Sequence, residues 1–235
     1  MFDIIGDVHG CIIELNLLLE KLGYNYNGYS NNRRLVFTGD LIDRGWYSLS
    51  VFLKVQEIVD SKCALLVRGN HDDKLMRWAK GNNVKFNHGF EKTSEEFSHI
   101  KDKVYKFLSS TPMYLSLDDG KLIVAHAAWK NSLKNIDPLD KKCRTWCLYG
   151  PTTGRMLENG LPDRIDWVIG RKEDFPLIVY GHQVYKEPRV LNNTYGIDTG
   201  CVFGGYLTAL RYPELEFVSI KAQWIYDKSK PEISL

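Results

Sequence analysis

Acidic and imidazole side chains recur in this sequence where an apolar run stops at a glycine. The first segment of this kind reads GDVHG and carries Asp7 and His9. Four later segments repeat the pattern, namely TGDLIDRG with Asp40, Asp43 and Arg44, RGNHDD with Asn70, His71 and Asp72, VAHAA with His126, and VYGHQ with His182. Aspartate oxygens, neutral imidazoles and an asparagine carbonyl, with no thiolate among them, suit a borderline divalent metal such as manganese, iron or zinc.

These segments supply more donors than one metal ion accepts. Two sites are filled if Asp40 bridges them, and the full set is Asp7, His9, Asp40, Asn70, His126 and His182. A pair of cations about 3.5–4 Å apart lowers the pKa of a bound water molecule and holds a phosphate for in-line displacement. The pattern therefore predicts a dinuclear centre that hydrolyses phosphoesters.

His71 is the candidate general acid. An imidazole next to the metals can protonate the leaving alkoxide, provided that a carboxylate fixes its tautomer and raises its basicity. Asp72 is its neighbour in the sequence, Asp198 in IDTGC is an alternative, and the sequence leaves the choice open. Asp43 is a further catalytic candidate, because it follows the same predicted strand as Asp40.

Arg44 is the candidate for phosphate binding, because a planar guanidinium donates two parallel hydrogen bonds to phosphate oxygens. Asn70 belongs to the same predicted site and is a second candidate substrate contact. Arg144 in KKCRTWCLYG is a candidate second phosphate-binding arginine, although nothing in the neighbouring sequence supports it. Arg44 is therefore the stronger prediction of the two arginines.

Each segment alone is a weak signal, because glycine and aspartate after a strand often form only a turn. The combination is stronger, since four of the six histidines lie at predicted strand ends, in segments that contain glycine or alanine. A purely structural role would require all of these buried polar groups to be paired, which is costly. The other two, His88 and His99, lie in a polar stretch and are interpreted as surface residues.

The elements that position these residues alternate along the first part of the chain. Apolar spacing predicts strands at 2–5, 34–39 and 63–70 and helices at 11–22, 48–59 and 72–81. This order is typical of a parallel sheet with helices on its faces, in which the carboxyl ends of the strands share one edge. We therefore expect an α/β fold that gathers the polar segments at that edge.

The second part of the chain is less regular. Residues 82–108 are polar and predicted to be partly helical, and residues 113–128 read as a hairpin that turns at Asp119-Gly120. Residues 128–176 are interpreted as an excursion over the sheet. Further strands are predicted at 176–182, 194–200, 205–212 and 215–222, with the last two joined at Pro213-Glu214.

Composition limits the class of protein. A chain of 235 residues with 44% apolar and 26% charged residues is typical of one globular domain, taken here as residues 1–235. A net charge of +2 gives no sign of a nucleic-acid or membrane surface. No apolar stretch approaches about 20 residues, and no basic leader is present. Five irregularly spaced cysteines indicate reduced thiols and a cytoplasmic location.

Five motifs follow one another along the chain, namely GDVHG, GDLIDRG, GNHD, a lone AHA and a lone GH. In this order they resemble the motifs of the phosphoprotein-phosphatase branch of the calcineurin-like metallophosphoesterases. The resemblance covers nearly the whole chain. It implies a four-layer α/β/β/α fold, with a β-sandwich flanked by helices, and hydrolysis by a hydroxide that bridges two metals. We expect manganese as the cation, with iron, zinc, nickel or cobalt as alternatives.

The family pattern also implies a role for each matching residue. The first metal would be held by Asp7, His9 and Asp40. The second would be held by Asp40, Asn70, His126 and His182. Arg44 would bind the phosphate and His71 would act as the general acid.

Three further segments narrow the resemblance. They read CLYGPTTG, GLPDRIDWV and IDTGCVFGG. All three are similar to segments of the phosphatase module of bacterial polynucleotide kinase-phosphatase, an RNA-repair enzyme, and of related bis(5'-nucleosyl)-tetraphosphatases. In the RNA-repair module, an aspartate matching Asp198 belongs to the active site. The chain departs from the usual family motifs at two positions, with HAA in place of HAG at Ala128 and GHQ in place of GHT at Gln183. We expect these changes to affect substrate preference rather than metal binding.

The predicted substrate is a nucleotide or RNA-end phosphate, either a 3'-phosphate or a 2',3'-cyclic phosphate. Diadenosine tetraphosphate is the nearest alternative and a phosphoserine or phosphothreonine protein comes third, because all three need the same metals. The excursion at 128–176 and the loop at 23–33 are expected to decide among them.

Neither a kinase nor a ligase domain is expected in the same chain, because no G-x-x-x-x-G-K-S/T phosphate loop occurs. A non-catalytic metal-binding scaffold is the alternative from another class of protein. Its expected sign is the loss of metal ligands, and every expected ligand is present. The oligomeric state is left open by the sequence.

Overall fold

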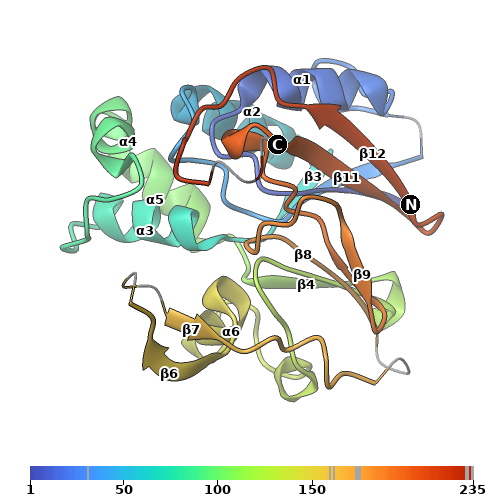
Figure 1. The fold of residues 1–235 in the computed structure, drawn as a ribbon. Helices are drawn as coiled ribbons and strands as arrows, with labels where there is room; N and C mark the ends of the chain where they lie inside the picture. Colours follow the sequence, from blue (N-terminus) through green and yellow to red (C-terminus); the bar gives the residue numbers. More distant parts are fainter. Residues whose placement is uncertain (31, 159, 161, 173–175, 231–232, 234–235) are drawn as a thin grey trace.

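Two five-stranded sheets lie face to face in the computed structural model, with helices on their outer sides (Figure 1). The structure describes residues 1–235 apart from 31, 159, 161, 173–175, 231–232 and 234–235. A short two-stranded ribbon, β6 (Thr152–Met156) with β7 (Pro162–Arg164), stands apart from both sheets. It belongs to the predicted excursion, whose positions 159, 161 and 173–175 lie outside the described residues.

The first sheet combines strands from both ends of the chain. Its members, in spatial order, are β12 (Glu216–Lys221), β11 (Tyr206–Tyr212), β1 (Phe2–Ile5), β2 (Arg34–Phe37) and β3 (Ala64–Leu66). The three N-terminal strands run parallel, whereas β11 lies antiparallel to β1 and β12 antiparallel to β11. Strand β1 is therefore an inner strand, paired on both edges.

The second sheet is built from the middle of the chain. Its members, in spatial order, are β4 (Tyr114–Leu117), β5 (Leu122–Ala125), β8 (Leu177–Tyr180), β10 (Thr194–Gly196) and β9 (Arg189–Leu191). The three inner strands run parallel, and the two edge strands are antiparallel to their neighbours. Each sheet thus contributes three parallel strands whose carboxyl ends can carry site residues.

Six α-helices are present among the described residues. They are α1 (Ile12–Lys21), α2 (Ser48–Asp60), α3 (Asn70–Ala79), α4 (Phe90–Phe97), α5 (Lys101–Ser109) and α6 (Arg144–Tyr149). Helices α1 and α2 lie over the first sheet, and α6 lies on the side of the second sheet (Figure 1). No helix in the described part of the chain is long and apolar enough to cross a membrane.

Three apolar clusters separate the layers. Alternate residues of a strand point to opposite faces, so Ile5 of β1 packs with α1 and α2 while Ile4 packs toward the second sheet. In β8, Val179 belongs to the same cluster as Ile4, between the two sheets, whereas Ile178 belongs to a third cluster that includes residues of α6. The layers are therefore helices, sheet, sheet and helices, which confirms the four-layer fold implied by the resemblance.

The fold places the strands that periodicity left without partners. Periodicity predicted a parallel sheet from the first three strands, which is present, while most of the later strands form a second sheet and β11 and β12 extend the first sheet in antiparallel fashion. Periodicity identifies a strand without identifying its partner. The hairpin at 113–128 is confirmed, with a 3₁₀ turn at Asp118–Gly120, whereas β9 and the β6–β7 ribbon were not predicted.

Phe52 on α2 provides a test of the helical layer beneath the site. Its ring makes edge-to-face contacts with Phe97 and Phe107 at centroid distances of 5.2 and 5.5 Å. We expect Phe52→Ala to lower the free energy of unfolding by about 3–5 kcal/mol, because buried aromatic truncation leaves a cavity. Urea unfolding measures the loss. Leu53→Ala, at the exposed neighbouring position, should change it by about 0.5 kcal/mol or less, and equal effects would contradict this packing.

Candidate active site

The polar segments predicted from the sequence meet where the two sets of parallel strands end. The loop after β1 carries Asp7 and His9, and the loop after β2 carries Asp40, Asp43 and Arg44. Asn70 and His71 begin α3 directly after the β3 turn, and the remaining loops carry His126 after β5, His182 after β8 and Asp198 after β10. The site is therefore assembled from both sheets.

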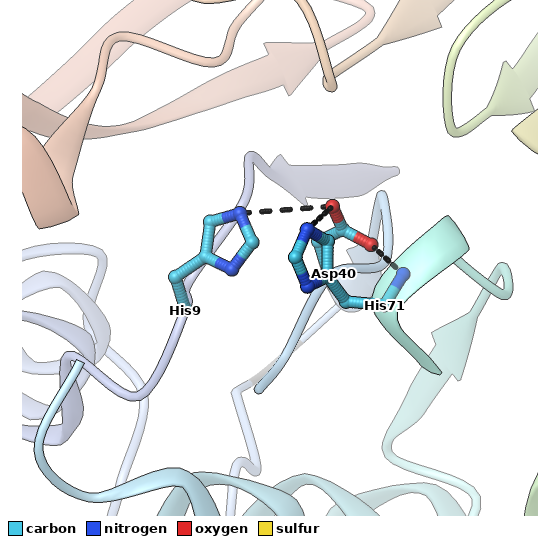
Figure 2. A group of neighbouring side chains, drawn as sticks. All are labelled: His9, Asp40 and His71. Carbon is cyan, nitrogen blue, oxygen red and sulfur yellow. Dashed lines mark hydrogen bonds and ion pairs between the residues drawn. The ribbon is translucent and has the colours of Figure 1, made fainter. Parts of the chain in front are cut away.

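Asp40 is the carboxylate shared by the two halves of the site. His9 and His71 both approach this carboxylate (Figure 2), with Nε2 of His9 3.6 Å and Nε2 of His71 4.0 Å from Oδ2 of Asp40. The His71 backbone N–H donates to the second oxygen, Oδ1, at 2.9 Å. Nε2 of His126 lies 3.3 Å from Oδ2 of Asp40. One oxygen atom thus faces three imidazoles.

The second group of donors converges on His126. Its Nε2 lies 3.0 Å from Oδ1 of Asn70 and 3.1 Å from Nδ1 of His182. The ligand atoms of Asp40, His126 and His182 lie within 4.8 Å of one another, as do those of Asp40, His9 and His71. Asp40 belongs to both groups, as expected for a bridging ligand.

Backbone carbonyls fix which nitrogen of each imidazole faces the site. Nδ1 of His9 lies 2.7 Å from the Ile42 carbonyl, and Nδ1 of His126 lies 3.0 Å from the Thr38 carbonyl. A carbonyl only accepts, so each Nδ1 carries a proton, and Nε2 of the neutral His9 presents a lone pair to Asp40. The buried Nε2 of His182 has no hydrogen-bond partner in the described residues. Lone pairs that face one another in this way fit a bound cation.

The pKa values of His9 and His182 agree with neutral imidazoles in the site. Burial lowers the pKa of His9 to about 3 and that of His182 well below its usual value, so both side chains are uncharged. Burial also acts to lower the pKa of His126, but the carboxylates of Asp40 and Asp7 raise it to about 10, so Nε2 of His126 also carries a proton that a bound cation would displace. The site therefore has an excess of negative charge, which divalent cations would neutralise.

Asp7 stands behind His126 and His182. Its Oδ1 accepts a hydrogen bond from the Thr38 hydroxyl at 3.1 Å, and its Oδ2 accepts one from the His182 backbone N–H at 2.9 Å. Burial, followed by the charge of Asp198, raises the pKa of Asp7 well above its usual range. The structure thus brings all six predicted metal ligands into one cluster.

Two glycines permit this close packing. A Cβ atom on Gly181 would overlap Oδ1 of Asp7, and a Cβ atom on Gly69 would overlap the carboxylate and backbone of Asp40. Any larger residue at either position would displace an aspartate from the cluster. Both glycines belong to the segments that the sequence singled out.

Asp43 is the carboxylate that orients His71. Its Oδ2 lies 2.5 Å from Nδ1 of His71, while Oδ1 accepts a hydrogen bond from the Thr93 hydroxyl at 2.7 Å. Lys74 is a further partner, with Nζ 2.9 Å from Oδ2. Burial acts to raise the pKa of Asp43, but the contact with His71 lowers it. The choice that the sequence left open between Asp72 and Asp198 is thus resolved in favour of Asp43.

Asp72, one of the two candidates for the carboxylate that orients His71, binds backbone N–H groups instead. Its carboxylate accepts hydrogen bonds from the backbone N–H groups of Gly69, Asp40 and Leu41, at 2.9, 2.8 and 3.0 Å. Burial, with the charge of Asp40, raises its pKa to about 6. Asp72 therefore fixes the backbone that carries Asp40 and does not face the His71 ring.

Asp198 lines the cavity without contacting His71. Its Oδ1 accepts a hydrogen bond from the Gly200 backbone N–H at 3.0 Å. Burial raises its pKa to about 6, and the charge of Asp40 adds to the increase. The residue therefore contributes negative charge behind the cluster, next to Asp7.

The arginines differ from the sequence prediction in one respect. Arg44 lines the cavity, as expected. Arg144 is not among the described residues that line it, because its guanidinium is held 2.5 Å from the buried carboxylate of Asp73. Arg164 lines the cavity in its place and donates to the Tyr149 carbonyl. Arg164 lies in GLPDRIDWV, which the sequence had marked only for its resemblance.

The cavity in front of the cluster has a volume of about 770 Å³. Its floor includes His9, Asp40, Asn70, His182 and Asp198. Backbone strain is concentrated beside it, since φ is positive at His9, Asp40, Asp43, Arg44 and His182. Residues other than glycine keep such conformations where the surrounding structure enforces them, and functional sites are the usual place.

Known proteins share this sequence and this fold. Residues 1–205 match the family model of the calcineurin-like phosphoesterases. A protein of Anoxybacillus flavithermus named asymmetrical bis(5'-nucleosyl)-tetraphosphatase PrpE is 45% identical over 98% of both chains. A protein of the same name from Oceanobacillus iheyensis is 46% identical over 94% of this chain and 92% of its own.

Solved structures agree on the fold. A candidate diadenosine tetraphosphatase has a TM-score of 0.61 at 21% identity, covering 95% of this chain and 93% of its own. A serine/threonine phosphatase of Saccharomyces cerevisiae has a TM-score of 0.62 at 16% identity, covering 95% of this chain and 79% of its own. The chain therefore belongs to the calcineurin-like phosphoesterase family and is an enzyme that hydrolyses phosphoric esters.

Proposed function

We propose that the chain hydrolyses bis(5'-nucleosyl) tetraphosphates asymmetrically, to a nucleoside monophosphate and a nucleoside triphosphate. The observation that carries this proposal is the 42–46% identity, over nearly the whole chain, to relatives that bear this activity in their names. It favours the dinucleoside substrate, the alternative from the sequence, over the RNA-end phosphate predicted first. The match continues through the excursion at 128–176, where substrate preference is expected to be decided.

The charge of the cavity supports a polyphosphate substrate. Its wall carries Arg44, Lys74, Arg77, Lys85, Arg164 and Lys230. Arg44 and Lys74 form ion pairs with aspartates, whereas Arg77 and Lys85 form none with the residues that the structure describes. Cations that face a cavity without a protein counterion are available for additional phosphate groups. A monoester offers one phosphate, and a dinucleoside tetraphosphate offers four.

The six predicted ligands are proposed to hold two divalent cations, with manganese as the expected metal. Asp40 would be shared, with Asp7 and His9 on one side and Asn70, His126 and His182 on the other. Cations bound there would lower the pKa of a water molecule and neutralise phosphate charge. The oxygen and nitrogen donors suit manganese, iron or zinc. The sequence, the family match and the shared inner core together support a single metallophosphoesterase domain over residues 1–235.

The remaining site residues act on the phosphate and on the leaving group. Arg44 donates hydrogen bonds to phosphate oxygens as negative charge increases on them. His71 protonates the oxygen that departs, and Asp43 keeps Nδ1 of that imidazole protonated so that Nε2 faces the reaction. Nε2 lies 4.0 Å from Oδ2 of Asp40, which places the proton donor beside the shared ligand.

A substrate panel tests the proposed function. Manganese-loaded protein is assayed against diadenosine tetraphosphate, an RNA 3'-phosphate, a 2',3'-cyclic nucleotide and a phosphothreonine peptide, with products separated by chromatography. We expect the highest kcat/KM for the dinucleotide, with AMP and ATP in equal amounts. Two molecules of ADP would contradict asymmetrical cleavage, and preference for an RNA end would restore the first prediction from the sequence.

Removal of Asp40 tests the shared ligand. We expect Asp40→Ala to retain about one manganese ion or fewer per chain, where the unchanged protein retains about two, because the bridge is lost. Turnover should fall by about a thousandfold or more. Metal analysis after desalting measures the first effect independently of activity. Asp102→Ala, an exposed aspartate of α5, is the matched control, and full metal content in Asp40→Ala would contradict the assignment.

His71→Ala tests the proton donor. We expect metal content to stay unchanged and the rate for a poor leaving group, such as phenyl phosphate, to fall by about 10²–10⁴-fold. The rate for p-nitrophenyl phosphate should fall much less, because its leaving group needs little protonation. Asp43→Asn should show the same pattern with smaller losses. Equal losses on both esters would exclude His71 as the general acid.

A further inference from the structure

The segment that follows β12 returns to the cavity. Beyond the family match, which ends at residue 205, the backbone N–H groups of Tyr226 and Asp227 donate to the Val202 carbonyl at 3.0 and 2.9 Å. The Tyr226 hydroxyl lies 3.0 Å from both carboxylate oxygens of the buried Glu14 on α1. Residues 222–230 are therefore anchored to the turn that carries Val202 and to α1.

Asp227 in this segment makes the closest polar contact of Arg44. Its Oδ2 accepts a hydrogen bond from Nη1 of Arg44 at 2.6 Å, and both side chains are mostly buried, with 14% of Arg44 and 19% of Asp227 exposed. Phe203 lies against the guanidinium, 5.1 Å from ring centroid to Cζ, and Nδ1 of His88 lies 3.4 Å from Nη2. The guanidinium is thus enclosed from three directions, with the cavity on the fourth.

We propose that Asp227 is a positioning residue, which holds the Arg44 guanidinium in the orientation that binds phosphate. The proposal rests on the proposed role of Arg44 as a phosphate contact. A guanidinium has five N–H donors, and Asp227 engages one nitrogen of the three. Apart from the Nη2 donor that faces Nδ1 of His88, the remaining N–H groups can reach two oxygens of a phosphate, and a fixed planar fork loses little entropy when it binds them.

The surroundings of Asp227 favour positioning over competition with phosphate. Its Oδ1 accepts a hydrogen bond from the Ser229 backbone N–H at 2.8 Å, so the carboxylate is held within its own turn. A carboxylate fixed in this way cannot follow the guanidinium toward the cavity. The backbone of Arg44 has a positive φ of 66°, and this loop conformation fixes the direction in which the side chain leaves the main chain. The ion pair therefore fixes the one part of Arg44 that could otherwise rotate.

A double-mutant cycle tests this proposal with p-nitrophenyl phosphate, a phosphoester that offers one phosphate and no nucleoside. Asp227→Asn, Arg44→Ala and the double variant are compared by kcat, KM and the inhibition constant of orthophosphate. We expect Asp227→Asn to lower kcat/KM about tenfold, mainly through KM, and to weaken orthophosphate inhibition to a similar extent. In the Arg44→Ala background, the same change should have no further effect.

Three outcomes would overturn the proposal. Unchanged kcat/KM in Asp227→Asn would remove any role for the ion pair, and increased kcat/KM would show that Asp227 competes with phosphate. Equal losses with and without Arg44 would show that Asp227 acts on the fold. Coupling on p-nitrophenyl phosphate supports the proposal even if diadenosine tetraphosphate is not cleaved, so failure of the proposed function is a separate result.

Two controls separate positioning from stability. Glu216→Gln makes the same type of change on the exposed part of β12 and should leave every kinetic constant unchanged. Melting temperature and metal content are measured for each variant. If Asp227→Asn does not fold, Asp227→Glu completes the cycle, because it keeps the charge and moves the carboxylate by one methylene group. Partial recovery of phosphate binding in Asp227→Glu supports positioning, and full loss independent of Arg44 contradicts it.

Discussion

The active site depends on one unfavourable arrangement, in which acceptor atoms face each other around the Asp40 carboxylate. Oδ2 of Asp40 lies 3.6 Å from Nε2 of His9, which presents a lone pair, and 3.3 Å from Nε2 of His126, which would present one once a bound cation displaces its proton. Such a cluster would relax apart if its members were free to move. It persists because each member is tied from behind, by the Thr38 and Ile42 carbonyls and by the Asp72 carboxylate under the Asp40 backbone.

The two-sheet architecture supplies these ties from independent directions. The first sheet delivers Asp40 and His9, and the second delivers His126 and His182. The apolar cluster between the sheets, which includes Ile4, Val36 and Val179, keeps the two sets of strand ends at a fixed separation. The donors lie on loops at the ends of two packed sheets, and the packing of those sheets fixes where the loops begin.

Most of the donor set could be predicted from the sequence, because each donor comes directly after an apolar run and the spacing is short. The partner of His71 could not, since Asp43 reaches it from another loop while the adjacent Asp72 points to the backbone of Asp40 and Leu41. Helical geometry explains this difference, because residues adjacent in a helix point in different directions. Arg164 was missed because it lies on β7, a short strand of the β6–β7 ribbon that hydrophobic periodicity did not predict. Periodicity did not assign the later strands to a second sheet, because strand partners are set by packing over long sequence separation, and the two-sheet arrangement was predicted through the family resemblance.

The pairing of β1 has a consequence for how the protein is made. Phe2 pairs with Arg34 on one edge of β1 and with Tyr212 on the other. During synthesis, the strand that leads to Asp7 and His9 therefore has an unsatisfied edge until almost the whole chain has left the ribosome. Contacts of such high sequence separation slow folding, and an unpaired strand edge invites association with other chains. Folding of the catalytic centre is thus a late event, and nascent chains that carry β1 and β2 without β11 are the species on which chaperones would act.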